Sequence, residues 1–357
     1  AALRAEDYDG FWYSGARDMG NGEIGWSPTS VEPRKQHVYS TLANMVGFLF
    51  ETPGGSHRVV DNGTRVVEIP ADERYRHQVR GEYIGQRELI RYAAANPAKL
   101  RAVVAKARAD AIARGNDDSD NDQFPIAYEQ KEKFREQFWY RAGGRGASPD
   151  ATFELIEGPI LTSWEPTETI TRPWGYLIPN SLTMVLPLLR QHDIRVKQLT
   201  EPVELEVETW YATEVTHDEY VQAHYLKSVK AERRTETVSL PAGSIFIPSG
   251  QPGSNLISDL LEPITNDNLV TWGFLDNVVQ VTPSAEERAD QRAQIVAQLA
   301  SMSAEARAQM GARMESQLQQ ASQGRPIPIY RVMKKADIPG VLVRPFNAYE
   351  PNQYIRK

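Results

Sequence analysis

Glu51 is the carboxylate of this 357-residue chain whose surroundings point most directly to chemistry. It follows a continuous apolar run from Met45 to Phe50, and Pro53 with the pair Gly54-Gly55 comes soon after it. An apolar run of this kind predicts a strand buried on both faces of a parallel or mixed sheet. Because ligands bind at strand ends in open α/β sheets, a carboxylate at this point is placed for catalysis. The alternative is that Glu51 is only the first solvated residue after a core strand.

Three other polar segments could bind ions, but none has the spacing of a known site. His217-Asp218-Glu219 lies close to His224, and a hairpin loop explains this grouping without a metal. Residues 115–122 are acidic, but they lack the spaced Gly and the distal Glu of an EF-hand. We interpret them as an exposed domain linker. Gly143-Gly144-Arg145-Gly146 could hold an anion on its backbone amides, and a Gly-rich turn between strands is the simpler interpretation.

Composition narrows the functional class. With 41% hydrophobic residues the chain can fill genuine cores, and its length allows two domains. A net charge of −7 gives no basic stripe, which argues against nucleic acid or an anionic membrane as the main partner. The absence of cysteine excludes disulfides and thiolate chemistry. The sequence has no nucleotide-binding glycine motif and no Gly-x-Ser-x-Gly elbow.

The region around Glu51 resembles a known family. His37 to Thr52 is similar to the strand that carries the catalytic glutamate in zinc carboxypeptidases of the M14 family. Two later blocks resemble the long region that follows the peptidase domain in large secreted bacterial members. These blocks are Arg172–Pro179 and the stretch from Leu240 to Pro248 that continues through Leu260–Pro263 to Trp272–Phe274.

The resemblance implies a zinc-bound water that attacks a peptide carbonyl, with Glu51 as the general base. It also implies a secreted or periplasmic location and a peptide substrate. Family members place a mobile tyrosine on a loop before the catalytic strand, and Tyr13 is a candidate match. The aromatic residues near it have a simpler interpretation, in which they pack the loop onto its own domain.

The zinc ligands of the family are missing from this sequence. The family uses a His-x-x-Glu pair and a later histidine, all upstream of the catalytic glutamate, and zinc needs three such ligands. Of the six histidines only His37 precedes Glu51, and none is followed three residues later by Glu. We therefore expect the C-terminal part of a larger carboxypeptidase, with zinc as its cofactor and the missing N-terminal half as its partner. The alternatives are a pseudo-peptidase of the same family and a non-catalytic binding or assembly protein.

The predicted fold class is α/β: the remainder of a mixed-sheet carboxypeptidase domain, then a β-rich accessory domain and a C-terminal helical segment. The predicted domain limits are 1–115, 123–280 and 281–357. Apolar spacing predicts helices at about 73–95 and 97–114, with Pro97 opening the second and Asn96 as its N-cap. A strand–helix–strand order over 176–199 predicts a small parallel βαβ unit. Ser284 is the predicted N-cap of a helical stretch that continues to Gln323 and is broken near Ser301–Ser303 into a helical pair. An extended segment that lies back on a domain is predicted to follow it.

Overall fold

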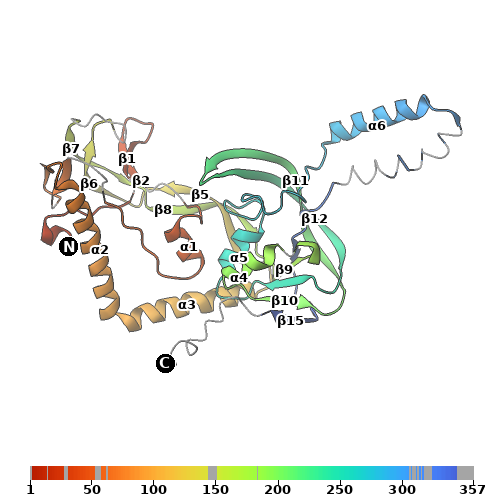
Figure 1. Cartoon of the computed structure of the whole chain (residues 1–357), viewed down its shortest axis with the longest axis horizontal. Helices are drawn as coiled ribbons and strands as arrows, with labels where there is room; N and C mark the ends of the chain where they lie inside the picture. The colour runs from red at the N-terminus through yellow and green to blue at the C-terminus, as the bar shows by residue number, and fades with distance from the viewer. Residues whose placement is uncertain are drawn as a thin grey trace. The chain divides into compact units, whose positions relative to one another are not determined.

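The computed structural model describes residues 2–13, 15–27, 31–52, 58–61, 63–143, 151–182, 184–304 and 324–343, with isolated positions between 307 and 316 (Figure 1). The chain forms two compact units. Unit 1 contains residues 1–41, 45–106 and 127–168, and unit 2 contains residues 42–44, 107–126 and 169–357. This division follows packing and differs from the predicted limits 1–115, 123–280 and 281–357, which remain a prediction.

Unit 1 is built from a small sheet, a hairpin and helices. Its four-stranded sheet has the order β1-β2-β7-β6, in which β2 and β7 run parallel and the other neighbours antiparallel. The elements are η1 (Arg4–Glu6), β1 (Gly15–Asp18), β2 (Ile24–Ser27), α1 (Gln36–Leu42), β3 (Arg58–Asp61), β4 (Arg65–Glu68), α2 (Arg74–Ala95), β6 (Phe134–Arg141) and β7 (Phe153–Ile160). The strands β3 and β4 pair only with each other among the described strands.

The predicted helix pair is confirmed. After α2 the chain turns into α3 (Pro97–Gly115), which opens at Pro97 because proline lacks the N–H that a first helical turn leaves unpaired. Asn96 sits at the junction, and its side-chain amide donates to the carbonyl of Tyr92 in the preceding helix.

Unit 2 centres on a seven-stranded sheet of order β12-β11-β14-β9-β13-β10-β15, in which every neighbouring pair is antiparallel. These strands are β9 (Gly175–Ile178), β10 (Val196–Leu199), β11 (Val203–Val221), β12 (His224–Leu240), β13 (Ile245–Pro248), β14 (Tyr330–Val332) and β15 (Gly340–Val343). Two further strands of the described residues, β5 (Gln123–Lys131) and β8 (Ser163–Thr171), pair with each other.

The predicted strand–helix–strand order over 176–199 is present, but its two strands do not pair with each other. Between β9 and β10 the chain forms η3 (Asn180–Leu182) and α4 (Val185–Gln191). Strand β13 lies antiparallel between β9 and β10, so these two strands run in the same direction without contacting each other as a pair. The expectation of a parallel strand pair is therefore wrong, because a strand distant in sequence occupies the position between them.

The segment containing His217 and His224 is a hairpin end, as predicted. Gln222 and Ala223 connect β11 to β12 with positive φ angles of 48° and 67°, which suit a tight two-residue turn.

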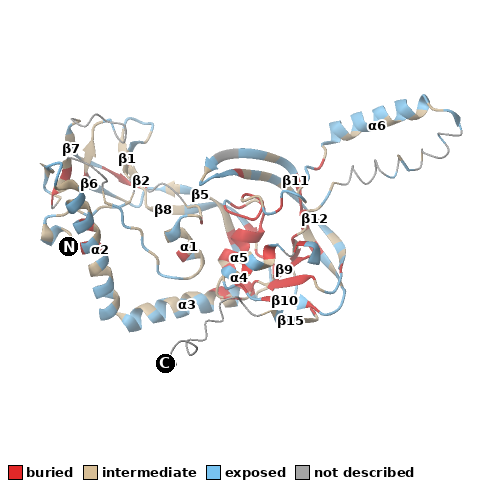
Figure 2. Cartoon of the chain, viewed as in Figure 1, coloured by how far each residue is buried: buried red, intermediate tan, exposed pale blue. Residues whose placement is uncertain are grey.

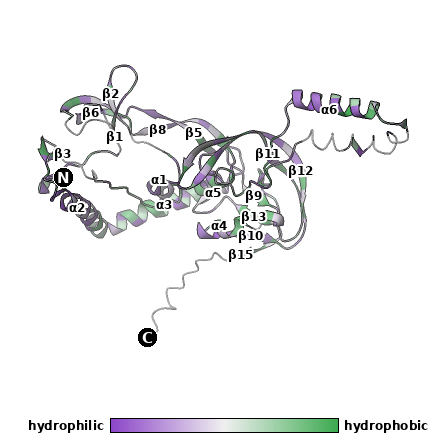
Figure 3. Ribbon diagram, turned by 45° about the horizontal axis from the view of Figure 1, so that its top comes forward, coloured by the Kyte–Doolittle hydropathy of each residue, from purple (hydrophilic) through white to green (hydrophobic). Residues whose placement is uncertain are grey.

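The helix that begins after Ser284 is also confirmed as α6 (Ala285–Ala300). The Ser284 hydroxyl accepts from the Glu287 N–H at 3.2 Å, and the Glu287 carboxylate accepts from the Ser284 N–H at 2.7 Å, which forms a complete capping box. Figure 3 shows α6 as mainly hydrophilic with short hydrophobic stretches. The segment beyond it does lie back on a domain, since β14 and β15 join the sheet of unit 2.

The core of unit 2 is formed by α4, α5 (Ser254–Leu261) and the strands they cover. Buried residues gather there in Figure 2, where α2 of unit 1 is instead coloured mostly intermediate and exposed. No helix in the described parts of the chain is long and apolar enough to cross a membrane.

Two predictions about the first third of the chain are wrong. Residues 45–50 form neither strand nor helix, and no described strand pairs with them, so an apolar run alone did not produce a buried strand. The acidic segment 115–122 is not a free linker. Asp122 is buried and pairs with Arg172, and the Asp118 carboxylate accepts from the backbone N–H of Lys335 at 3.2 Å.

Candidate functional site

Glu51 lies in an irregular segment of unit 1 and is exposed. Its carboxylate has no hydrogen bond or ion pair with any other residue in the described ranges. The pair Gly54-Gly55, which follows it, lies outside the described residues. The Glu51 side chain is therefore open to solvent, and no polar contact of its carboxylate with a described residue fixes its orientation.

Tyr13 and His37, two other residues singled out from the sequence, lie near each other. Their ring centroids are 6.5 Å apart in an edge-on arrangement, with His37 on α1. The neighbouring aromatic residues pack within unit 1: the ring of Trp26 lies 4.6 Å from that of Phe11 and 5.3 Å from that of Phe138. The simpler interpretation of this N-terminal stretch, packing onto its own domain, accounts for these rings.

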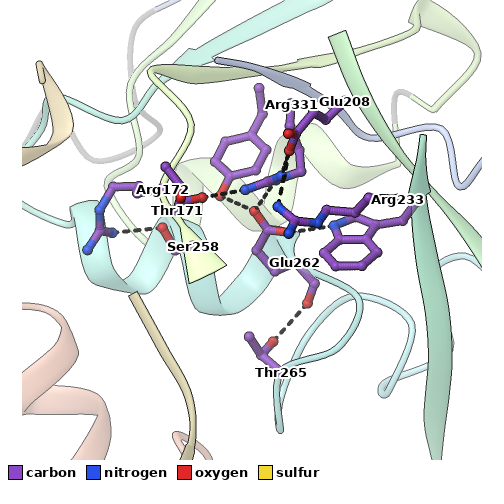
Figure 4. A network of polar contacts seen from close by, with 10 residues as sticks. Thr171, Arg172, Glu208, Arg233, Ser258, Glu262, Thr265 and Arg331 are labelled. Carbon is purple, nitrogen blue, oxygen red and sulfur yellow. Dashed lines mark hydrogen bonds and ion pairs between the residues drawn. The ribbon is translucent and has the colours of Figure 1, made fainter. Parts of the chain in front are cut away.

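The strongest polar cluster of the molecule lies in unit 2 and was not predicted. Glu262 follows α5, Arg331 lies in β14, and both side chains are completely buried. The Arg331 Nε donates to Glu262 Oε1 at 2.8 Å (Figure 4). Tyr176 Oη donates to the same oxygen at 2.8 Å, and Trp210 Nε1 donates to Glu262 Oε2 at 2.6 Å. The Glu262 carboxylate thus has three donors.

The guanidinium of Arg331 uses its remaining nitrogens on two further strands. It pairs with the Glu208 carboxylate of β11 and donates to the carbonyl of Thr171, the last residue of β8 (Figure 4). Arg233 of β12 also reaches Glu208, at 3.3 Å. Five segments that are distant in the sequence are therefore tied together through one arginine and two glutamates.

Burial shifts the pKa values of both residues in the Arg331–Glu262 ion pair. It raises the pKa of Glu262 to about 7, while the hydrogen bonds from Trp210 and Tyr176 act in the opposite direction. It lowers the pKa of Arg331 to about 10.

A second buried arginine holds the segment that precedes β5. Arg172 Nε donates to Asp122 Oδ2 at 2.6 Å, and its terminal nitrogens donate to α5, at 2.7 Å to Ser258 Oγ and 2.9 Å to Asn255 Oδ1. The Phe124 ring lies 5.0 Å from the guanidinium carbon. Arg172 thus fixes the acidic segment to α5.

Asp259 on α5 is a third buried titratable group. Burial, reinforced by the negative charge of Asp267, raises its pKa to about 7. Its neighbour Asp267 accepts from Trp272 Nε1 at 3.2 Å. Asp259 therefore loses its proton near neutral pH, which makes unit 2 sensitive to pH.

These buried clusters hold the fold of unit 2 rather than offer a reactive surface. Arg331 and Glu262 have no exposed side-chain area, so a substrate cannot reach them without opening the core. Sequence reasoning missed them because they lie 69 residues apart. One signal was available: Arg331 and Glu262 are charged residues that directly follow apolar residues, Ile329-Tyr330 and Leu260-Leu261.

No metal site is formed by the described residues. They contain no group of three or more His, Cys, Asp or Glu side chains that could hold an ion. His37 in particular has no such partners there, so the residues present do not fit a zinc ion.

Comparison with known proteins gives a distant relative. A segment of 121 residues, 34% of this chain, is 28% identical to Carboxypeptidase 2 from Trichophyton rubrum. The chain is thus distantly similar to a fungal carboxypeptidase over about a third of its length. The matched segment spans 22% of that relative's length. No family model and no solved structure matches the chain.

Proposed function

We propose that this chain contributes the general base, Glu51, to a zinc-dependent carboxypeptidase of the M14 type. The similarity to Carboxypeptidase 2 carries the proposal, because it favours a peptidase over the other classes that the composition allows. The substrate would be a peptide, and the location secreted or periplasmic.

Glu51 suits the role of a proton acceptor for two reasons. It is exposed, so a water molecule and a substrate can reach it, and no described side chain occupies its oxygens. A general base must lie within hydrogen-bonding reach of the proton it takes. Residues outside the described structure would have to supply that geometry.

Zinc would be the cofactor, bound by ligands outside this sequence, and the partner would be the polypeptide that carries them. Because the described residues do not make a zinc site, the chain by itself should hold no stoichiometric zinc. Metal analysis after dialysis tests this. One tightly held zinc per molecule of this chain would contradict it.

Replacing Glu51 tests the catalytic role in the enzyme reconstituted with its zinc-binding part. Glu51→Gln keeps the shape of the side chain but removes proton acceptance, so the rate of peptide hydrolysis should fall by at least about 10²-fold. Zinc content should not change, because Glu51 is not a proposed ligand. Glu68→Gln is the matched control, since Glu68 is also exposed, lies in unit 1 and ends strand β4. Equal activity of both variants would show that Glu51 is an ordinary solvated residue with no catalytic role.

A second candidate is a non-catalytic binding or assembly protein, or a pseudo-peptidase of the same family. The exposed apolar side chains of unit 1 favour it, because such surfaces mark contacts with other proteins. The reconstituted protein distinguishes the two. Assembly without bound zinc or peptide hydrolysis would support the second candidate.

A further inference from the structure

Residues 263–276 of unit 2, which we call the clasp, fold back over the end of α5. The N–H of Leu269 donates to the carbonyl of Leu260 at 3.1 Å, which brings the loop onto the last turn of the helix. The Thr265 hydroxyl donates to the carbonyl of Asp259 at 2.5 Å. The clasp therefore covers the helix turn that carries the Asp259 carboxylate.

A buried asparagine ties the two halves of the clasp together. The Asn268 amide nitrogen donates to the carbonyls of Pro263 at 3.1 Å and Thr265 at 2.7 Å. Its amide oxygen accepts from the backbone N–H groups of Val270 at 2.7 Å and Thr271 at 3.0 Å. Buried polar groups that are satisfied in this way specify one conformation. We therefore expect the clasp to open and close as one unit.

The other side of the clasp holds the start of β12. The backbone N–H of Lys227 donates to the carbonyl of Thr271 at 3.2 Å, and the Lys227 ammonium pairs with Asp276. The ring of His224 lies edge-on to that of Trp272, with centroids 5.4 Å apart. The clasp thus links the end of α5 to the end of the β11–β12 hairpin.

Two buried carboxylates belong to this arrangement, Asp259 on α5 and Asp267 in the clasp, and they expose 8% and 6% of their area. Among the described groups, the charge that acts on Asp259 is the like charge of Asp267. The buried arginines Arg172 and Arg331 form ion pairs with other carboxylates. Burial and the like charge together raise the pKa of Asp259 to about 7.

We infer that Asp259 and Asp267 form a pH-dependent catch, which holds the clasp closed while Asp259 is protonated and loosens it when Asp259 ionises. Opening the clasp returns both carboxylates to water, which removes the cost of burying two like charges. Because the closed form keeps a proton that the open form releases, closure is strongest below about pH 4. It should weaken by up to about tenfold per pH unit up to pH 7, and level off above that value.

Glu262 titrates in the same range but does not control the clasp. Burial raises its pKa to about 7. Its carboxylate accepts from Arg331, Tyr176 and Trp210, and none of these residues lies in the clasp. Opening the clasp leaves these three bonds in place, so Glu262 affects global unfolding rather than the catch.

Loosening the clasp would change the aromatic surface of unit 2. Among the described residues, the exposed aromatic side chains of this unit are Tyr220, Tyr225 and Phe274. Phe274 lies in the clasp. The two tyrosines are paired across the hairpin end that the clasp holds, with ring centroids 4.8 Å apart. The catch thus makes the presentation of these rings to solvent depend on pH.

Hydrogen exchange of the whole chain, measured by mass spectrometry at about pH 5 and about pH 7, tests the catch. After correction for the intrinsic effect of pH, the protection of residues 263–276 should fall at least about 10-fold between these values. The clasp should also exchange faster than β10, whose Leu199 N–H donates to the Ser244 carbonyl at 2.8 Å, because local opening costs less than global unfolding. Unchanged protection of the clasp, or protection equal to that of β10 at both pH values, would overturn the inference.

Three substitutions assign the effect to the acid pair. Asp259→Asn removes the ionisation, so the protection of the clasp should differ by less than about 2-fold between the two pH values. Asp267→Asn removes only the like charge, so the fall should remain but be smaller. Asp276→Asn is the control, because it breaks the ion pair with Lys227 and should lower protection by the same factor at both pH values.

A fall in Asp259→Asn as large as that of the wild type would contradict the catch. If Asp259→Asn does not fold, Asp267→Asn decides the question. A fall equal to that of the wild type in Asp267→Asn would show that the two carboxylates do not act as a pair, and would overturn the inference.

Discussion

Unit 2 buries thirty-two hydrophobic side chains among the residues that the structure describes, whereas unit 1 buries four. Both apolar core clusters found in the described residues belong to unit 2. Unit 1 instead contains twelve of the twenty large hydrophobic residues that are exposed, among them Tyr75, Tyr83 and Ile90 on α2. The contrast shows that one chain can combine a unit with a large apolar core and a unit that buries few hydrophobic side chains among its described residues.

The ion pairs of the two units also differ in burial. In unit 2 the pairs Arg331–Glu262 and Arg172–Asp122 are removed from solvent. In unit 1, pairs such as Arg87–Glu6 and Arg80–Glu6 remain partly exposed. Exposed ion pairs contribute little to stability, whereas removing one partner of a buried pair leaves the other charge buried and unpaired. Ion pairs therefore contribute more to the stability of unit 2 than to that of unit 1.

The largest effect should come from breaking the central ion pair of unit 2. Arg331→Met leaves the Glu262 carboxylate buried with no cation and should lower the free energy of unfolding by about 3–5 kcal/mol. Denaturant unfolding followed by tryptophan fluorescence measures this, since Trp210 contacts Glu262. The control is Lys230→Met, which removes an exposed pair with Glu214 and should cost at most about 1 kcal/mol. Similar losses in both variants would contradict a structural role for the buried network.

A smaller effect should appear in the pH dependence of unit 2. Because the pKa of Asp259 is raised to about 7 in the folded state, the folded protein holds a proton that the unfolded chain has released. The stability that this provides is full below about pH 4 and is lost as the pH rises through 7, at no more than about 1.4 kcal/mol per pH unit.

Unfolding midpoints measured from pH 4 to pH 8 check this. Asp259→Asn should reduce the slope without abolishing it, because burial also raises the pKa of Glu262 to about 7. Asp276→Asn, at a more exposed aspartate, should leave the slope unchanged. If the wild type and Asp259→Asn have the same slope, another group governs the pH response.

The smallest effect should follow from removing an exposed apolar side chain of unit 1. Ile90 on α2 is 68% exposed, so Ile90→Ser should change the free energy of unfolding by less than about 0.5 kcal/mol. Ile84→Ser on the same helix is the matched contrast, because Ile84 is fully buried and should lose several-fold more. A large loss of unfolding free energy in Ile90→Ser would show that this face of α2 is covered in solution and contributes to the stability of unit 1.

Local signals in the sequence were enough to predict several elements. Pro97 separates α2 from α3, and the Ser284–Glu287 pair opens α6, because proline and capping residues act on backbone groups within one turn. The distant similarity to a carboxypeptidase agrees in kind with the resemblance seen around Glu51, although the comparison tests neither Glu51 nor zinc.

Contacts between distant residues were decided only by the tertiary structure. The run Met45–Phe50 has the composition of a buried strand, yet strands exist through pairing, and no described strand pairs with it. Strand β13, about fifty residues from β10 in the sequence, lies between β9 and β10. Each of these two strands therefore has β13 as an antiparallel neighbour, and they do not pair with each other. The Arg331–Glu262 pair similarly depends on β14 returning to the sheet from the end of the chain. Sequence therefore determined where helices and strands begin, because those signals act over a few residues. Which strands pair and which charges are buried depended on chain segments meeting across long loops, and no local pattern records that.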